Sequence, residues 1–208
     1  MNSSKSRRLN VMSTGRLVVG VTGASGAIYA QRFLIEAAKR WPEIYLILSD
    51  QAIQVAATEL GVAPKRENFS AVEWLGADYP QITLLDSKNY FTPPASGSFR
   101  HDGMVIVPCS MGTAGRIANG ISDDLLTRSA DVCLKERRPL IVVPREMPMH
   151  AIMLRNLATL AETGATVIPA CPAWYHRPSS LEELADTVVA RILQSLGAEQ
   201  SLMKEWMV

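Results

Sequence analysis

A chain of 208 residues has room for one α/β domain with a sizeable core. Its 21 basic and 20 acidic residues leave a formal charge of +1, without the basic excess of a general nucleic-acid or membrane-surface binder. Three cysteines with no CxxC spacing fit buried thiols in a reducing compartment, and no apolar run approaches the ~20 residues of a membrane span. We therefore expect a cytoplasmic protein with no nucleic-acid or membrane partner.

The first fifteen residues, MNSSKSRRLNVMSTG, are polar and basic and contain no acidic side chain. We expect residues 1–15 to form a disordered basic tail, with Met12 as an alternative start. A transit peptide has a similar composition, but this segment is short and lacks an amphipathic pattern. Residues 16–208 are expected to form a single domain.

Short apolar runs alternate with amphipathic stretches along the rest of the chain. The runs predict strands at 17–21, 43–48, 82–85, 104–107, 140–143 and 166–168. The stretches between them predict helices at 27–40, 50–60, 71–75, 111–118, 123–136, 149–163 and 180–196. Ser49 or Asp50 would cap the second helix, and Ser180 with Glu183 reads as a capping box for the last.

Continuous apolar strands alternating with helices predict a mainly parallel sheet covered on both faces. The expected fold class is α/β, a single-domain flavodoxin-like or Rossmann-like architecture with three layers, α/β/α. In such folds ligands bind beyond the carboxyl ends of the strands. The long polar loop 86–101, which contains PPASGS, is also expected to be functional because long loops in compact domains usually are.

Two turns of small residues follow predicted strands, TGASG at 22–26 and PCSMGT at 108–113. Their backbone amides, with the hydroxyls of Ser25, Ser110 and Thr113, can cradle a phosphate or the edge of a cofactor ring. The first turn alone is equally compatible with a purely structural role, since it is not a full GxGxxG and lacks a P-loop lysine. Two such turns in one sheet favour a phosphorylated planar cofactor, and the missing acidic residue after the second strand disfavours a dinucleotide.

Charged side chains follow the later strands. Arg145 and Glu146 come directly after strand 140–143. They are either a surface ion pair or a functional pair, in which Arg145 binds an anion and Glu146 moves a proton. Arg191 shares a helical stripe with Leu184 and Val188, so its side chain must snorkel, pair or serve a site.

Arg128 and Lys135 lie seven residues apart and hence on one helical face. They either stabilise the negative end of the helix or extend toward an anion, and the sequence alone does not choose. The three histidines show no HxxxH spacing, so no metal site is expected.

Taken in order, the segments VTGASGAIYA, SDQAIQVAATE, PPASGS, PCSMGT, LLTRSADVCLKERRPLIVVPRE and PAWYHRP resemble the UbiX-type flavin prenyltransferases. The resemblance spans roughly residues 16–197, and the long block at 125–146 is its most specific part. It implies a homododecamer with active sites between subunits. It also implies that reduced flavin mononucleotide (FMN) receives a dimethylallyl group from dimethylallyl phosphate, without a metal. The product would serve a UbiD-type decarboxylase.

The resemblance also implies residue roles. Flavin binding falls to Gly23, Ala24, Ser25, Ser49, Ser110, Met111, Gly112, Thr113 and Arg145. The prenyl phosphate would be bound by Ser96, Arg128, Lys135, Tyr175 and Arg191. Cationic side chains can stabilise the leaving phosphate and make a magnesium ion dispensable.

Catalytic roles fall to Ser25, Glu146 as a proton relay, Glu59 at the flavin, and Tyr90, whose ring would stabilise the allylic cation. Tyr90, followed by Phe91, stands where certain relatives carry tryptophan. Met111 also departs from related forms. Neither the donor, monophosphate or pyrophosphate, nor the recipient decarboxylase is specified by the sequence.

Three other functions are compatible with parts of the pattern. A flavin-dependent cysteine-type decarboxylase shares the PASG-type loop but uses a histidine base, and no histidine lies near the first helix here. Direct decarboxylation of an aromatic acid would need no dimethylallyl phosphate. A non-catalytic flavin carrier would leave Glu146, Lys135 and Arg191 without a task.

Overall fold

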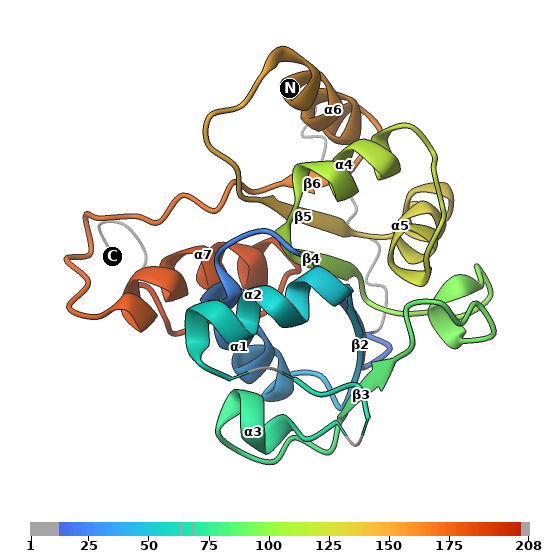
Figure 1. Ribbon diagram of the computed structural model, residues 1–208. Coiled ribbons are helices and arrows are strands. Elements are labelled where there is room, and N and C mark those ends of the chain that lie inside the picture. The colour runs from blue at the N-terminus through green and yellow to red at the C-terminus, as the bar shows by residue number, and fades with distance from the viewer. Residues whose placement is uncertain (1–12, 63, 68, 205–208) are drawn as a thin grey trace, which may run out of the picture.

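The protein is described from a computed structural model, which describes residues 13–62, 64–67 and 69–204. Six parallel strands form one sheet in the order β3–β2–β1–β4–β5–β6 (Figure 1). The strands are β1 (Arg16–Val21), β2 (Glu43–Leu48), β3 (Ile82–Leu85), β4 (Met104–Cys109), β5 (Leu140–Pro144) and β6 (Thr166–Val167). This is the strand order of the doubly wound Rossmann fold, and it confirms the expected fold class.

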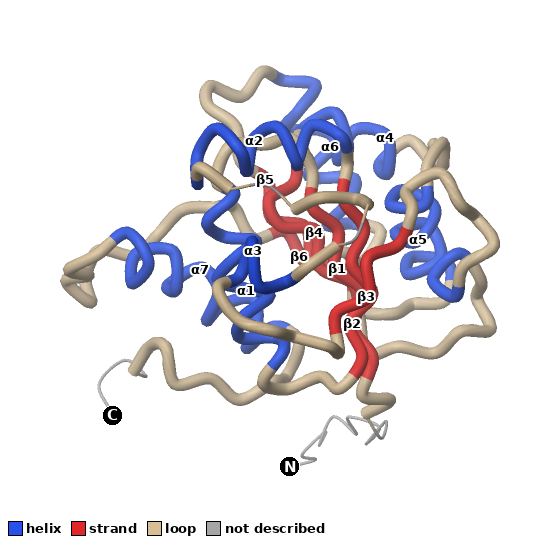
Figure 2. Tube along the Cα trace, turned by 60° about the horizontal axis from the view of Figure 1, so that its bottom comes forward, coloured by secondary structure: helices blue, strands red, loops and turns tan. Residues whose placement is uncertain are grey.

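Helices cover both faces of the sheet, so the molecule has three layers (Figure 2). Alternate residues of β1 separate the two cores: Leu17, Val19 and Val21 face one helical layer, and Val18 faces the other. The first layer contains α1 (Ala27–Ala38), α2 (Asp50–Leu60), α3 (Ala71–Leu75) and α7 (Leu181–Ser195). The second contains α4 (Met111–Ala118), α5 (Leu125–Lys135) and α6 (Ala151–Glu162).

All the predicted strands and helices are present, with ends shifted by one or two residues. The helix predicted at 123–136 begins at Leu125 because Asp124 is its N-cap, accepting from the Thr127 amide at 2.7 Å. The predicted capping box on α7 is only half formed. Ser180 accepts from the Glu183 amide at 3.1 Å, but the Glu183 carboxylate accepts from Ser179 instead of the Ser180 amide. The loop 86–101 contains one short 3-10 helix, η1 (Pro93–Ala95).

The tail predicted at 1–15 lies mostly outside the described residues. The three described residues of that segment lead into β1, and Ser13 and Thr14 both donate to Asp102. No described helix is long and apolar enough to cross a membrane. Cys109 and Cys133 are buried as expected, whereas Cys171 is exposed because it lies in the surface loop before α7.

Candidate functional site

The strand order reverses between β1 and β4, and a threonine ties their carboxyl ends together. The Thr22 hydroxyl donates to the Pro108 carbonyl at 2.9 Å and accepts from the Ser110 amide at 2.7 Å. The turns TGASG and PCSMGT therefore lie side by side at the topological switch point. This is where doubly wound folds bind their ligands.

A cavity of about 540 Å³ opens at this point. It is lined by Thr22, Gly23, Ser49, Gln51, Ser110, Gly112, Thr113 and Arg116. Five of these residues were predicted from the sequence, namely Gly23, Ser49, Ser110, Gly112 and Thr113. Thr22, Gln51 and Arg116 were not. Thr22 opens the TGASG turn and Gln51 lies in the first turn of α2, just after the Ser49 cap, so their positions beside the turns were the available signal. Arg116 lies near the end of α4, away from the Ser110 cap, and carried no such signal.

Two of the predicted serines begin the helices that meet at the cavity. Ser49 accepts from the Ala52 amide at 3.0 Å as the N-cap of α2, and Ser110 accepts from the Thr113 amide at 3.3 Å as the N-cap of α4. Gly23 permits the TGASG turn to approach the start of α2 closely, since a Cβ there would lie 2.3 Å from the Cβ of Gln51. The cavity thus combines hydroxyl groups, helix N-termini and a cation, Arg116.

Ser25 and Glu59 form a separate group at the start of α1. The Glu59 carboxylate accepts from the amides of Gly26 at 2.9 Å and Ala27 at 2.7 Å, and the Ser25 side chain also hydrogen-bonds to it. Burial raises the pKa of Glu59, but these three hydrogen bonds and the charge of Arg145 outweigh it and hold the pKa below its ordinary value. Glu59 is therefore ionised at neutral pH and occupies the anion-binding end of α1.

Four of the predicted flavin-binding residues do not line the cavity. Ala24 and Met111 are buried, and the Met111 side chain packs in the core against the second helical layer. Ser25 is engaged with Glu59, and Arg145 is exposed after β5. Glu146 is half-buried, and its carboxylate accepts from the Met147 amide at 3.1 Å.

A cationic group lies on the outer face of α5, against the loop that contains η1. Arg128 donates to the Ala95 carbonyl at 3.2 Å, and a Cβ built on Gly97 would lie 2.8 Å from the ammonium of Lys135. Ser96, between them in the loop, is exposed and shares a hydrogen bond of 2.8 Å with Ser98. This arrangement brings the predicted phosphate ligands Ser96, Arg128 and Lys135 together. Tyr90, in the same loop, donates to the Ser122 carbonyl at 3.2 Å.

Tyr175 and Arg191 lie on the other side of the sheet. Arg191 is an exposed residue of α7, pairing with Gln194 at 2.8 Å, and Tyr175 is in the exposed loop before that helix. Because α5 and α7 pack on opposite faces, one chain does not assemble all five predicted phosphate ligands. Figure 1 likewise places η1 and the start of α7 on opposite sides of the molecule.

Among the described residues, no group of three histidine, cysteine, aspartate or glutamate side chains could hold a metal ion. The predicted absence of a metal stays a prediction. For flavin mononucleotide the residues present do fit. The cavity has a volume typical of ligand pockets, a glycine where any side chain would clash, and donors suited to a phosphate.

Doubly wound α/β proteins bind nucleotide-like cofactors in a cavity at the switch point. The fold and the cavity described above place this protein in that class. Comparison with known proteins specifies the class, since the Flavoprotein family matches residues 5–194. The flavin prenyltransferase UbiX of Pseudomonas aeruginosa is 43% identical over 195 residues, covering 92% of this chain and 93% of the relative. The chain therefore belongs to the flavin prenyltransferase UbiX family, as its motifs indicated.

Two solved structures agree. AnUbiX in complex with FMN and dimethylallyl pyrophosphate is 37% identical, with a TM-score of 0.81 over 92% of this chain and 96% of that one. A dodecameric FMN-dependent UbiX-like decarboxylase from Escherichia coli O157:H7 is 35% identical, with a TM-score of 0.80 over 93% of this chain and 100% of that one. The peptidyl-cysteine decarboxylase EpiD, at 17% identity and a TM-score of 0.57, shares the fold alone.

Proposed function

We propose that this protein transfers a dimethylallyl group from dimethylallyl phosphate to reduced FMN. The carbon–oxygen bond to phosphate breaks, and phosphate leaves with the electron pair. The prenyl group forms one bond to the central-ring nitrogen of the flavin and a second bond to the neighbouring carbon of the dimethylbenzene ring, which closes a fourth ring. The nitrogen and the ring carbon each lose a proton, and the prenyl double bond takes one up. The observation that carries this reaction is the group Ser96, Arg128 and Lys135, in which two cations lie beside the loop segment that carries the Ser96 hydroxyl. A flavin carrier would have no use for such a group.

The cations would take the role that a metal plays in many phosphate-leaving reactions. Arg128 is held by Asp131 at 2.9 Å and Lys135 by Glu136 at 2.6 Å, so each cation is oriented while retaining further N–H donors. Stabilising the departing phosphate lowers the barrier to breaking the carbon–oxygen bond. The ring of Tyr90, in the same loop, would stabilise the positive charge that develops on the prenyl group.

At the flavin, the turns at the switch point would bind FMN through Gly23, Ser49, Ser110, Gly112 and Thr113 and the main chain of Ala24 and Met111. Arg145 would bind the cofactor from the end of β5. Glu59 orients the Ser25 hydroxyl, and Ser25 with Glu146 would carry the proton lost during ring closure. Glu59 itself acts as the anionic partner, because its lowered pKa makes it a poor proton donor.

A second copy of the chain would complete the site. The phosphate ligands of α5 and those of the α7 side lie on opposite faces of one sheet, so Tyr175 and Arg191 must reach the phosphate from another subunit. The dodecameric structural relative supports a homododecamer. Exposed apolar side chains on the loops around the site, among them Phe91, Met147 and Trp174, would be covered in that assembly.

We further propose a cytoplasmic enzyme whose product is used by a UbiD-type decarboxylase. A modified flavin is made to be bound by another protein, and a thiol-reducing compartment suits the three free cysteines.

The decisive measurement is mass spectrometry of the flavin after anaerobic incubation of the protein with reduced FMN and dimethylallyl phosphate. We expect a flavin heavier by one prenyl unit. A flavin that binds tightly but stays unmodified with both the monophosphate and the pyrophosphate donor would contradict the proposal and favour a carrier.

Two variants connect the reaction to the residues. Glu146→Gln and Arg191→Ala should cut the yield of prenylated flavin while FMN still binds, since neither side chain lines the switch-point cavity. Flavin binding is followed by absorbance after gel filtration. Unchanged turnover in both variants would show that the residue roles are wrong even if the reaction itself is right.

A further inference from the structure

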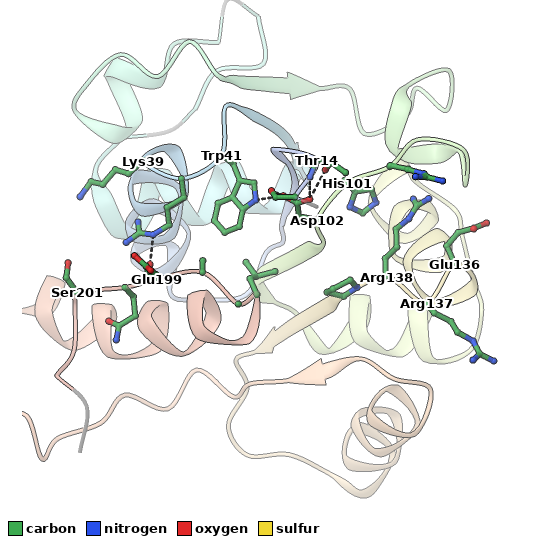
Figure 3. Close-up of a pocket in the computed structure, with 18 residues that line it drawn as sticks. Thr14, Lys39, Trp41, His101, Asp102, Glu136, Arg137, Arg138, Glu199 and Ser201 are labelled. Carbon is green, nitrogen blue, oxygen red and sulfur yellow. Dashed lines mark hydrogen bonds between the residues drawn. The ribbon is translucent and has the colours of Figure 1, made fainter. Parts of the chain in front are cut away.

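A second and larger cavity, about 1150 Å³, lies at the opposite edge of the sheet, where the strands begin (Figure 3). Its walls come from the segments that precede β1, β4 and β5 and from the residues after α1 and α7. It shares no lining residue with the switch-point cavity. We call it the amino-edge groove.

The floor of the groove is held in place by Asp102. Its carboxylate accepts from Trp41 Nε1 at 3.0 Å, from Ser13 Oγ at 2.6 Å, and from both the amide and the hydroxyl of Thr14. Trp41 and the neighbouring His101 are each only 6% exposed. The floor is therefore preformed, and the negative charge of Asp102 is already engaged.

The walls and rim are rich in cations. Five basic side chains line the groove against three acidic ones: Lys39, Arg40, Arg100, Arg137 and Arg138 against Asp102, Glu136 and Glu199. Lys39 and Arg40 pair with Glu36, and Arg138 donates to the carbonyls of Phe99 and Gly97.

The side chains of Arg100 and Arg137, by contrast, are exposed and have no hydrogen-bond or ion-pair partner among the described residues. Figure 3 shows Arg137 at the outer edge of the groove, away from the carboxylates of Asp102 and Glu199. Two guanidinium groups thus remain available at the rim.

The backbone of Arg137 is strained. Helices α4, α6 and α7 end with the same pair of backbone hydrogen bonds as α5, and their left-handed residue is in each case a glycine: Gly120, Gly164 and Gly197. On α5 that position is Arg137, with φ 54°. A left-handed conformation is costly for any residue with a Cβ, so the chain accepts strain to keep an arginine where a glycine would be more stable.

We propose that the amino-edge groove binds a phosphorylated small molecule through the unpaired guanidinium groups of Arg100 and Arg137 at its rim. A guanidinium group offers paired N–H donors that match the oxygens of a phosphate. The groove is large enough to hold more than the phosphate itself, so a phosphate ester or diphosphate is the expected class of ligand. This site is additional to the phosphate ligands on α5 and α7.

The test is calorimetric titration of the full-length protein with inorganic pyrophosphate in an Arg191→Ala background, which weakens the proposed prenyl-phosphate site. Pyrophosphate should still bind. Adding Arg137→Gly should weaken that binding by about ten-fold, as expected for the loss of one charge-assisted pair, and Arg100→Gln should do the same. The melting temperature of the Arg137→Gly protein should not fall, because glycine suits the left-handed position.

Arg155→Gln is the matched control, since it removes one exposed positive charge from α6, outside the groove. Binding that disappears with Arg191→Ala alone, or that survives Arg137→Gly unchanged, would overturn the proposal. Equal loss with Arg155→Gln would do so as well, because the ligand would then respond only to total charge.

Discussion

At the scale of the residue, His101 couples stability to pH. Burial lowers its pKa below the ordinary value of 6.5, against a hydrogen bond to the Gly103 carbonyl at 2.9 Å that raises it. The unfolded chain therefore takes up a proton more readily than the folded one. The free energy of unfolding should fall as the pH drops below about 6.5, by at most about 1.4 kcal/mol per pH unit from this group. Urea unfolding at a series of pH values measures that slope.

The His101→Asn variant retains a donor toward Gly103 but has no titrating ring. It should be less stable overall and show a shallower slope between about pH 7 and about pH 5. His150→Asn, which removes an exposed imidazole, controls for the change of residue type. An unaltered slope in His101→Asn would assign the pH dependence to other groups. Asp102 is one such group. Burial raises the pKa of its carboxyl, but the hydrogen bonds from Ser13 and Thr14 outweigh burial and hold the pKa below its ordinary value. The contribution of Asp102 to the free energy of unfolding is therefore lost only at more acidic pH.

At the scale of the element, a substitution in the first turn of α4 should affect helix stability and cofactor binding in opposite directions. Gly112 lines the switch-point cavity, and a Cβ built there meets no atom within 4 Å. Gly112→Ala should leave the protein as stable or up to about 1 kcal/mol more stable, because alanine is the better helix former. It should weaken FMN binding, because the new methyl group would occupy space the cofactor needs. Thermal unfolding and fluorescence titration with FMN measure the two effects.

Gly115→Ala provides the comparison on the same helix. Its Cβ would lie 3.1 Å from the end of the Asn156 side chain, and it does not line the cavity. FMN affinity should be retained there. Equal affinity in Gly112→Ala and in the unmodified protein would place the flavin elsewhere.

At the scale of the whole molecule, the proposed sharing of one site between subunits can be tested by mixing inactive chains. Lys135→Ala removes a phosphate ligand on α5, and Arg191→Ala removes one on α7, across the sheet. If each site takes Lys135 from one chain and Arg191 from another, co-assembled variants should regain about a quarter of the activity by random pairing.

The prenylation rate of the co-expressed mixture, compared with each variant alone, gives the answer. Mixing the separately purified oligomers without dissociation is the control and should restore nothing. No recovery in co-expressed assemblies of verified mixed composition would mean that a single chain supplies the complete site.

Much of the fold could be predicted because each element carries its own signal. The strands of the central sheet are buried on both faces, so they read as apolar runs with clear ends. Helix ends were less exact. Asp124 reads as helix but acts as a cap, and Glu183 turns to Ser179 instead of closing a box. Such ends depend on one or two hydrogen bonds that neighbouring polar side chains can satisfy in more than one way.

Some residues of the candidate site could likewise be predicted from the sequence, and others could not. Gly23, Ser49, Ser110 and Thr113 could be predicted because parallel strands bring their carboxyl ends to one edge. Arg116 could not, since it is one turn into a helix and looks like an ordinary surface cation. The association of Ser25 with Glu59 was also invisible, because the two residues are 34 positions apart and meet only where α2 ends beside α1.

The sequence by itself determined the doubly wound class, the two small-residue turns at its switch point and membership of the flavin prenyltransferase family. Hydrophobic periodicity and local motifs are properties of neighbouring residues, and they survive without any knowledge of the fold. Only the tertiary structure decided that α5 and α7 lie on opposite faces, that Glu59 occupies the start of α1, and that unpaired arginines flank a groove at the other edge. Those relations depend on which helix packs on which face, and long-range packing sets them.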